Sequence, residues 1–80
     1  MANFVRATQE ELLFLDHYIP KGMISMVVYR TKRTRSQIIY QLRGMPKEQD
    51  EEIITALREI FYAVTQLKYE PKKFDSEKNE

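Results

Sequence analysis

The sequence has 80 residues, enough for one domain with a thin core, because a chain of this size buries only about 60 % of the surface that its unfolded form exposes. The net charge of +1, from 13 Lys and Arg against 12 Asp and Glu, indicates no partner by itself, and the lack of cysteine excludes disulfides and cysteine-based zinc sites. No uncharged run is longer than that of residues 22–29, which is too short to cross a bilayer, and no apolar secretion segment stands at the start, so we expect a cytoplasmic protein without a membrane partner.

A first helix is predicted to begin near Gln9. Thr8 is a good N-cap residue, and Glu11, three residues later, can complete a capping box. Pro20 and Gly22 are expected to end this helix. The residues at helical spacing that should form its buried face are Leu12, Leu15, Tyr18 and Ile19.

The next segment, residues 23–29, is an apolar run that suits either a helix or a strand. Val27 and Val28 are adjacent, so strict alternation between two faces fails, and a strand is the less favoured structure. We therefore expect a second helix that buries Ile24, Val27 and Val28. The strand remains an alternative.

A third helix is predicted to begin at Thr34, because Thr34 and Gln37 repeat the capping signature ahead of an apolar periodic stretch. Gly44 is expected to be its C-cap, and Pro46 suits the first turn of the following helix. The residues predicted to face the core are Ile38, Ile39 and Leu42.

A fourth and longer helix is predicted over residues 47–68. Its apolar face is longer than a small three-helix unit can cover, so we expect it to form a homodimer; the alternative is that it folds back across the first helix. The predicted dimerisation residues are Ile53, Leu57, Ile60, Phe61, Val64 and Leu67. The polar, aperiodic residues 70–80 are predicted to be a disordered tail.

These elements predict an all-α fold: a three-helix, helix-turn-helix-like unit at residues 7–45, followed by a C-terminal amphipathic helix within one domain, residues 1–69. The charge is distributed unevenly along this unit. Residues 17–47 contain no Asp or Glu and seven Lys or Arg residues, whereas the following stretch is acidic. A patch of one sign on a nearly neutral protein creates a local field for polyanions.

The polar side chains around the predicted start of the third helix are of the kinds that read a DNA major groove. Arg and Lys bind guanine or phosphate, Gln pairs with adenine, and Thr or Ser reaches phosphate oxygens. A helix that follows a short helix and a turn can present such side chains to duplex DNA. The predicted DNA-binding residues are Arg30, Lys32, Arg33, Thr34, Arg35, Ser36, Gln37, Tyr40, Gln41 and Arg43.

A resemblance to a known family supports this interpretation. The order Thr8-Gln9-Glu10-Glu11, Phe14-Leu15, Tyr18, Gly22, Val27-Val28, Arg33-Thr34, Ser36, Ile38 and Leu42 resembles the Myb/SANT-like trihelical DNA-binding domains of bacterial and phage regulators over residues 7–45. Ala7 stands where that family usually has tryptophan, and Thr31-Lys32 where it has Leu-Gly. The residues for which the resemblance implies DNA contact are Arg33, Thr34, Arg35, Gln37, Tyr40 and Gln41.

The sequence contains no motif of an enzyme. No phosphate-binding glycine loop, zinc-protease histidine pair or nucleophile elbow occurs, and His17 has no second ligand at a recognisable spacing, so we expect no catalysis, metal or cofactor. The sequence favours a small DNA-binding transcription regulator of bacterial or phage type. One alternative is a ribbon-helix-helix dimer with residues 23–29 as the strand. The other is an adaptor or inhibitor that binds another regulatory protein through its basic surface and amphipathic helix.

Overall fold

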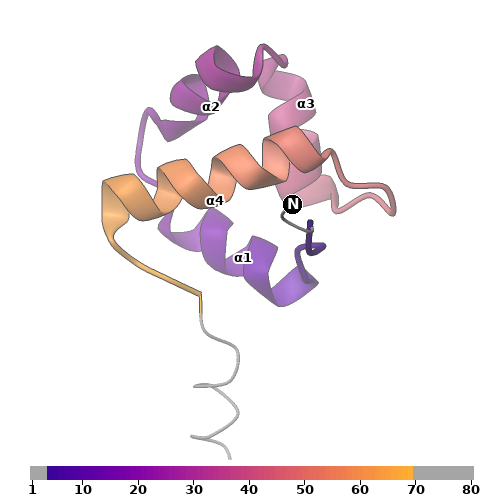
Figure 1. Cartoon of the computed structure of the whole chain (residues 1–80), viewed down its shortest axis with the longest axis horizontal. Helices are drawn as coiled ribbons and strands as arrows, with labels where there is room; N and C mark the ends of the chain where they lie inside the picture. Colours follow the sequence, from indigo (N-terminus) through magenta and orange to yellow (C-terminus); the bar gives the residue numbers. More distant parts are fainter. Residues whose placement is uncertain (1–3, 70–80) are drawn as a thin grey trace, which may run out of the picture.

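The computed structural model describes residues 4–69, and within them every regular element is helical (Figure 1). The elements are α1 (Gln9–Tyr18), α2 (Met23–Thr31), α3 (Arg35–Ile39), its direct continuation η1 (Tyr40–Gly44), which is a π-helical turn, and α4 (Glu51–Thr65). The all-α class is confirmed. The segment at residues 23–29 is helical, so the strand that a ribbon-helix-helix dimer requires is not formed. The predicted disordered tail lies outside the described residues.

The helix starts follow the capping signals of the sequence. The Thr8 hydroxyl accepts a hydrogen bond from the Glu11 backbone N–H at 3.1 Å, although the Glu11 carboxylate binds Arg58 instead of returning to Thr8. Thr34 and Gln37 form the complete predicted capping box: the Gln37 N–H donates to the Thr34 hydroxyl at 3.1 Å, and the Thr34 N–H donates to the Gln37 side chain at 2.9 Å. Both helices therefore begin where local hydrogen bonding fixes them.

The fourth helix is shorter at both ends than the predicted residues 47–68. Asp50 caps its start by accepting the backbone N–H groups of Glu52 and Ile53, so Pro46 lies in the preceding loop and not in the first helical turn. At the other end Gln66 takes a left-handed backbone with φ 65° and closes the helix.

Gly44 does not end the third helix in the predicted way. It remains inside η1, and the following residue, Met45, takes the left-handed conformation with φ 49°. A Cβ at Gly44 would lie 2.7 Å from Cδ1 of the Tyr40 ring, so a larger residue here would force this exposed ring to move. The missing side chain leaves room for that ring.

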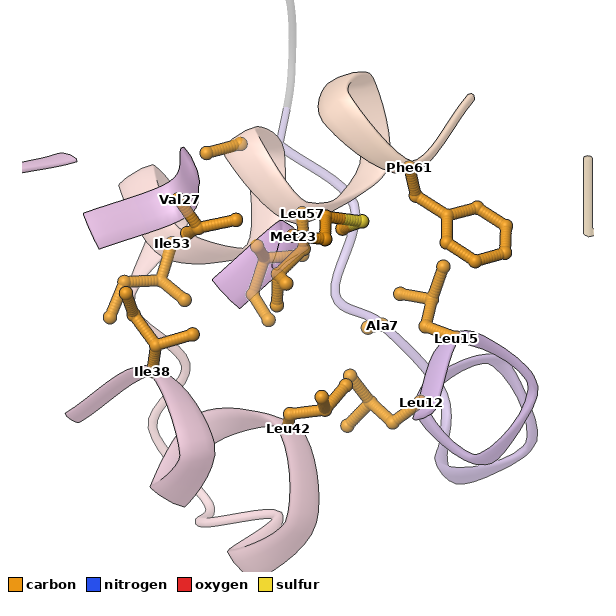
Figure 2. Packing of buried hydrophobic residues seen from close by; sticks show 12 residues of the cluster. Ala7, Leu12, Leu15, Met23, Val27, Ile38, Leu42, Ile53, Leu57 and Phe61 are labelled. Atoms are coloured by element: carbon orange, nitrogen blue, oxygen red, sulfur yellow. The ribbon is translucent and has the colours of Figure 1, made fainter. Parts of the chain in front are cut away.

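The core is built around α4, which crosses the middle of the molecule with α2 and α3 on one side and α1 on the other (Figure 1). In Figure 2, Phe61 faces Leu15, and Leu42 lies opposite Leu12. The buried hydrophobic residues are Ala7, Leu12, Leu15, Met23, Val27, Ile38, Leu42, Ile53, Ile54, Ala56, Leu57 and Phe61. Every helix contributes to this one cluster.

The predicted buried faces of the first two helices are corrected in detail. Leu12 and Leu15 are buried as predicted. Tyr18, the last residue of α1, is about half exposed and rests against the Phe14 ring. In α2 the fully buried residues are Met23, Val27 and Thr31, which lie one above another at a spacing of four and face α4. Ile24 and Val28 are only partly buried.

The predicted dimerisation face of α4 is largely used inside the monomer. Ile53, Leu57 and Phe61 are buried in the core, because α4 folds back against α2 and α1. These three residues are therefore not available to a partner. Ile60 is half-buried, and Val64 and Leu67 are exposed by 44 % and 40 %.

None of the helices in residues 4–69 is long and apolar enough to cross a membrane.

Candidate nucleic-acid interface

The connection between α2 and α3, residues 32–34, is closed by hydrogen bonds of its own. The buried Thr31 hydroxyl donates to the Val27 carbonyl at 2.8 Å and accepts the Arg33 backbone N–H at 3.2 Å. The Lys32 N–H donates to the Val28 carbonyl at 2.9 Å, and Lys32 itself has the left-handed φ of 63°. This short connection therefore fixes where α3 begins relative to α2.

The side of α3 and η1 that faces away from the core is polar, basic and aromatic. Ile38 and Leu42 are buried, while Arg35, Ser36 and Arg43 are exposed. The Tyr40 side chain, held beside Gly44, is 58 % exposed. Four of the predicted DNA-binding residues are thus brought together on one accessible helix face.

Two residues of α2 extend this face, and neither was predicted from the sequence. Arg35 Nη1 lies 3.4 Å from the Ser25 hydroxyl, and the Lys32 ammonium lies 5.0 Å from the centre of the Tyr29 ring. Tyr29 is 79 % exposed. Ser25 and Tyr29 are four residues apart on the side of α2 away from its buried stripe, and this spacing could have revealed them. We call the following exposed set the outer face: Ser25, Tyr29, Lys32, Arg35, Ser36, Tyr40 and Arg43.

Arg30 and Arg33 were also predicted to bind DNA, but the structure directs both toward α4. Arg33 pairs with Asp50, Nε to Oδ2 at 2.9 Å, and with Glu52, Nη2 to Oε1 at 2.6 Å. Arg30 pairs with Glu59. These two arginines tie the end of α2 to α4, so neither belongs to the outer face.

The Arg33–Asp50 pair changes the ionisation of both groups. The hydrogen bond from Arg33 lowers the pKa of the Asp50 carboxyl, and the backbone N–H groups of Ile53 and Glu52 lower it further, whereas burial acts in the opposite direction. The same hydrogen bond raises the pKa of Arg33. Asp50 is therefore held in its charged form while it caps α4.

The two predicted adenine-reading glutamines are both engaged within the protein. The Gln37 side chain is part of the capping box with Thr34, whose hydroxyl is occupied by the same motif. Gln41 was expected on the exposed face, but it is only 9 % exposed, and its side-chain oxygen accepts the Asp50 backbone N–H at 3.1 Å. The expectation of exposure is wrong for Gln41 because its amide satisfies the loop before α4.

Positive charge on the outer face is therefore carried by Lys32, Arg35 and Arg43. Arg43 pairs with Asp16 in the last turn of α1, Nε to Oδ1 at 2.9 Å. Within residues 4–69, Lys32 and Arg35 have no carboxylate within ion-pair distance. The outer face thus presents two unneutralised cations beside the start of α3.

Three of the acidic residues that follow the basic segment lie at the start of α4. Asp50, Glu51 and Glu52 occupy the cap and first turn of α4, and no three His, Asp or Glu side chains in residues 4–69 are grouped to hold a metal ion.

No protein family model matches the chain, and no curated protein or solved structure was found to be similar to it. Its function is therefore inferred from its residues and their geometry.

Proposed function

We propose that this protein is a small DNA-binding transcription regulator of bacterial or phage type, in which α2, the connection at residues 32–34 and α3 act as a helix-turn-helix. The observation that carries the proposal is the position of Lys32 and Arg35. Both are exposed, Lys32 begins the connection and Arg35 follows it directly, and within residues 4–69 neither is neutralised by a carboxylate. The neighbouring Arg30 and Arg33 are neutralised and face α4.

The form of the connection supports the same proposal. In the Myb/SANT-like pattern, a Leu-Gly pair precedes the third helix, and this chain has Thr31-Lys32 there. Thr31 is buried as the leucine would be, and Lys32 takes the left-handed backbone that glycine favours. A turn in place of the Leu-Gly pair is thus formed with Thr31 and Lys32, and Lys32 places a cation at this turn.

Contacts from the outer face follow from the chemistry of its side chains. We propose that Arg35 and Ser36, in the first turn of α3, reach base edges, and that Lys32 and Arg43 bind phosphates on either side of the groove. The Tyr40 ring, held beside Gly44, offers an apolar edge for a thymine methyl group and a hydroxyl for a phosphate. Gln37 and Gln41 are left out of this contact set because their side-chain oxygens, which a bidentate contact to adenine needs, accept hydrogen bonds within the protein.

The test compares two variants that each remove one positive charge, Lys32→Gln on the outer face and Lys68→Gln beyond the end of α4. Binding to a fluorescein-labelled duplex of random sequence is measured by anisotropy at several salt concentrations. Lys32→Gln should weaken binding several-fold and reduce the salt slope by about 1, the effect of losing one phosphate contact. Lys68→Gln should bind like the wild type. Equal effects of the two substitutions would show that the outer face is not the binding surface.

We also propose that the active form is a homodimer, now through the exposed end of α4. Val64 and Leu67 keep apolar surface outside the core, and the partly buried Ile60 lies one turn before Val64. A two-fold axis at this end would bring two copies of the outer face to one palindromic site. This interface is smaller than the one predicted from the sequence, because half of that set is buried.

A protein-binding regulator is the second candidate, and one observation favours it. A groove of about 370 Å³ lies between α1 and the end of α4, and its walls combine aromatic rings with charged groups. It is lined by Glu11, Leu15, Arg58, Phe61, Tyr62, Lys68 and Tyr69. An adaptor that binds another protein through this groove should show little affinity for random duplex DNA, so the same salt titration separates the two functions.

A further inference from the structure

The ion pair between Arg43 and Asp16 joins the outer face to the end of α1. Arg43 is in η1, which continues α3, the second helix of the proposed helix-turn-helix. Asp16 is in the last turn of α1. Their Nε and Oδ1 atoms are 2.9 Å apart, with the Arg43 side chain 61 % exposed and the Asp16 side chain 30 % exposed. The arginine is thus open to solvent on the side that the carboxylate does not cover.

The other ion pairs in residues 4–69 have a different relation to the outer face. Arg33 and Arg30 bind carboxylates of α4 and its cap, and Arg58 makes two hydrogen bonds to the Glu11 carboxylate, at 2.7 and 3.0 Å. Each of these pairs connects two elements away from the outer face. Of the two arginines on the outer face, Arg43 is paired with a carboxylate within residues 4–69, and Arg35 is not.

We propose that Asp16 occupies the place of a DNA phosphate on Arg43. In the free protein the carboxylate holds the guanidinium at the edge of the outer face, and on duplex DNA a phosphate oxygen replaces the carboxylate oxygen. This inference rests on the proposed function and adds a residue outside α2 and α3 that limits DNA affinity. Asp16 is a positioning residue that also competes with the ligand.

The exchange is physically reasonable because the pair is exposed. An exposed ion pair contributes little to folding, so breaking it does not endanger the domain. A guanidinium binds phosphate and carboxylate oxygens in the same planar geometry, which makes one a good substitute for the other. After the exchange, Asp16 remains close to the DNA backbone as an uncompensated negative charge, and this repulsion weakens the complex.

The experiment uses two variants of the full chain that each neutralise one carboxylate of an exposed arginine pair. Asp16→Asn releases Arg43 on the outer face, and Glu59→Gln releases Arg30 beside α4. Both raise the net charge by one, so any general effect of charge is the same in the two proteins. Affinity for a random-sequence duplex is measured by anisotropy between about 50 and 200 mM salt, a range over which phosphate contacts change affinity strongly. Circular dichroism melts check that both variants fold.

We expect Asp16→Asn to bind about three- to ten-fold more tightly than the wild type, and Glu59→Gln to differ from it by less than about two-fold. Arg43→Gln should weaken binding, and adding Asp16→Asn to Arg43→Gln should bring a smaller gain than Asp16→Asn brings to the wild type, because part of the effect of the carboxylate acts through the arginine.

Two results would overturn the inference without touching the proposed function. One is equal tightening by Asp16→Asn and Glu59→Gln, which would be a general charge effect. The other is the same gain from Asp16→Asn with and without Arg43. If the folded wild type and Asp16→Asn both fail to bind duplex DNA at the lowest salt concentration, the proposed function fails, and this inference fails with it.

Discussion

The α3–η1 helix and α4 are both amphipathic, yet they use their surfaces in opposite ways. In α4, Ile53, Ile54, Leu57 and Phe61 are buried, and its apolar stripe is covered by α2 on one side and α1 on the other. The α3–η1 helix buries Ile38, Gln41 and Leu42 along a narrower stripe, and apart from the partly buried Ile39 the rest of its circumference is exposed.

The width of the apolar stripe decides which helix can serve a partner. A wide stripe requires cover, and in a chain this small the other helices supply it, so α4 becomes the centre of the core. A narrow stripe anchors a helix by one edge and leaves its other side chains free. The buried stripe of α4, the longest helix, is therefore not accessible to a partner, and only the end of this helix keeps exposed apolar residues.

The largest expected effect is on the buried side of this comparison. Leu57→Ala should lower the free energy of unfolding by about 2 to 5 kcal/mol, because it removes a fully buried side chain and leaves a cavity. Tyr40→Ala, on the exposed side of η1, should change it by no more than about 0.5 kcal/mol. Urea denaturation followed by circular dichroism measures both. Similar values for the two variants would contradict the different roles of the two helices.

The next effect concerns the cap of α4 and depends on pH. The lowered pKa of Asp50 means that its charged form stabilises the fold above the ordinary carboxyl pKa near 3.9, and that this contribution disappears as pH falls through the lower folded-state pKa. Asp50→Asn keeps a capping oxygen but loses the charge that Arg33 binds. We expect it to be less stable than the wild type by about 1 to 2 kcal/mol at pH 7.

The difference between the wild type and Asp50→Asn should shrink as the pH is lowered toward 3, because the wild-type carboxyl then approaches protonation. Urea titrations at pH 7, 5 and 3 follow it. A constant difference across this range would show that the Asn side chain fails as a cap and that the charge of Asp50 is not important.

A smaller effect is expected at the start of α3. Thr34→Ala removes the hydroxyl that accepts the Gln37 N–H and should cost about 1 kcal/mol of stability. Thr34→Ser is the matched control, since it keeps the hydroxyl. A loss of stability with the serine variant equal to that with alanine would mean that the methyl group, and not the cap, stabilises this end of the helix.

The smallest effect on stability should come from the exposed end of α4. Val64→Glu should alter the free energy of unfolding by less than about 0.5 kcal/mol, but it should convert the proposed dimer into a monomer in sedimentation velocity experiments. Ala63→Glu adds the same charge about 100° further round the helix and should leave the dimer intact. A wild type that sediments as a monomer at tens of micromolar, alone and on DNA, would refute the dimer.

What the sequence predicted correctly is local. The caps at Thr8 and Thr34 and the helical form of residues 23–29 depend on neighbours within one turn, and the residue pattern contains that information. The end of the third helix shows the limit of local signals. Gly44 indicates a left-handed C-cap by its identity alone, whereas the left-handed residue is Met45 and Gly44 leaves room for the Tyr40 ring.

What the sequence did not predict depends on distant partners. Arg33 and Arg35 have the same chemistry and stand two positions apart, but the carboxylate of Asp50, 17 positions along the chain, engages only Arg33. Gln41 is polar and was placed outside, yet its amide completes the loop before α4 from a buried position. From the apolar stripe of α4 one can predict that these residues are buried. The pattern does not indicate whether a second copy or other helices of the same chain bury them.

The left-handed backbone of Lys32 has a consequence for how this protein can change during evolution. A side chain other than glycine in that conformation stores about 1 kcal/mol of strain, and a single substitution to glycine would release it. The same substitution would remove one of the two unneutralised cations from the outer face. Selection for stability alone would therefore replace Lys32, and selection for the proposed binding would retain it, so position 32 is where the two demands on this small domain oppose each other.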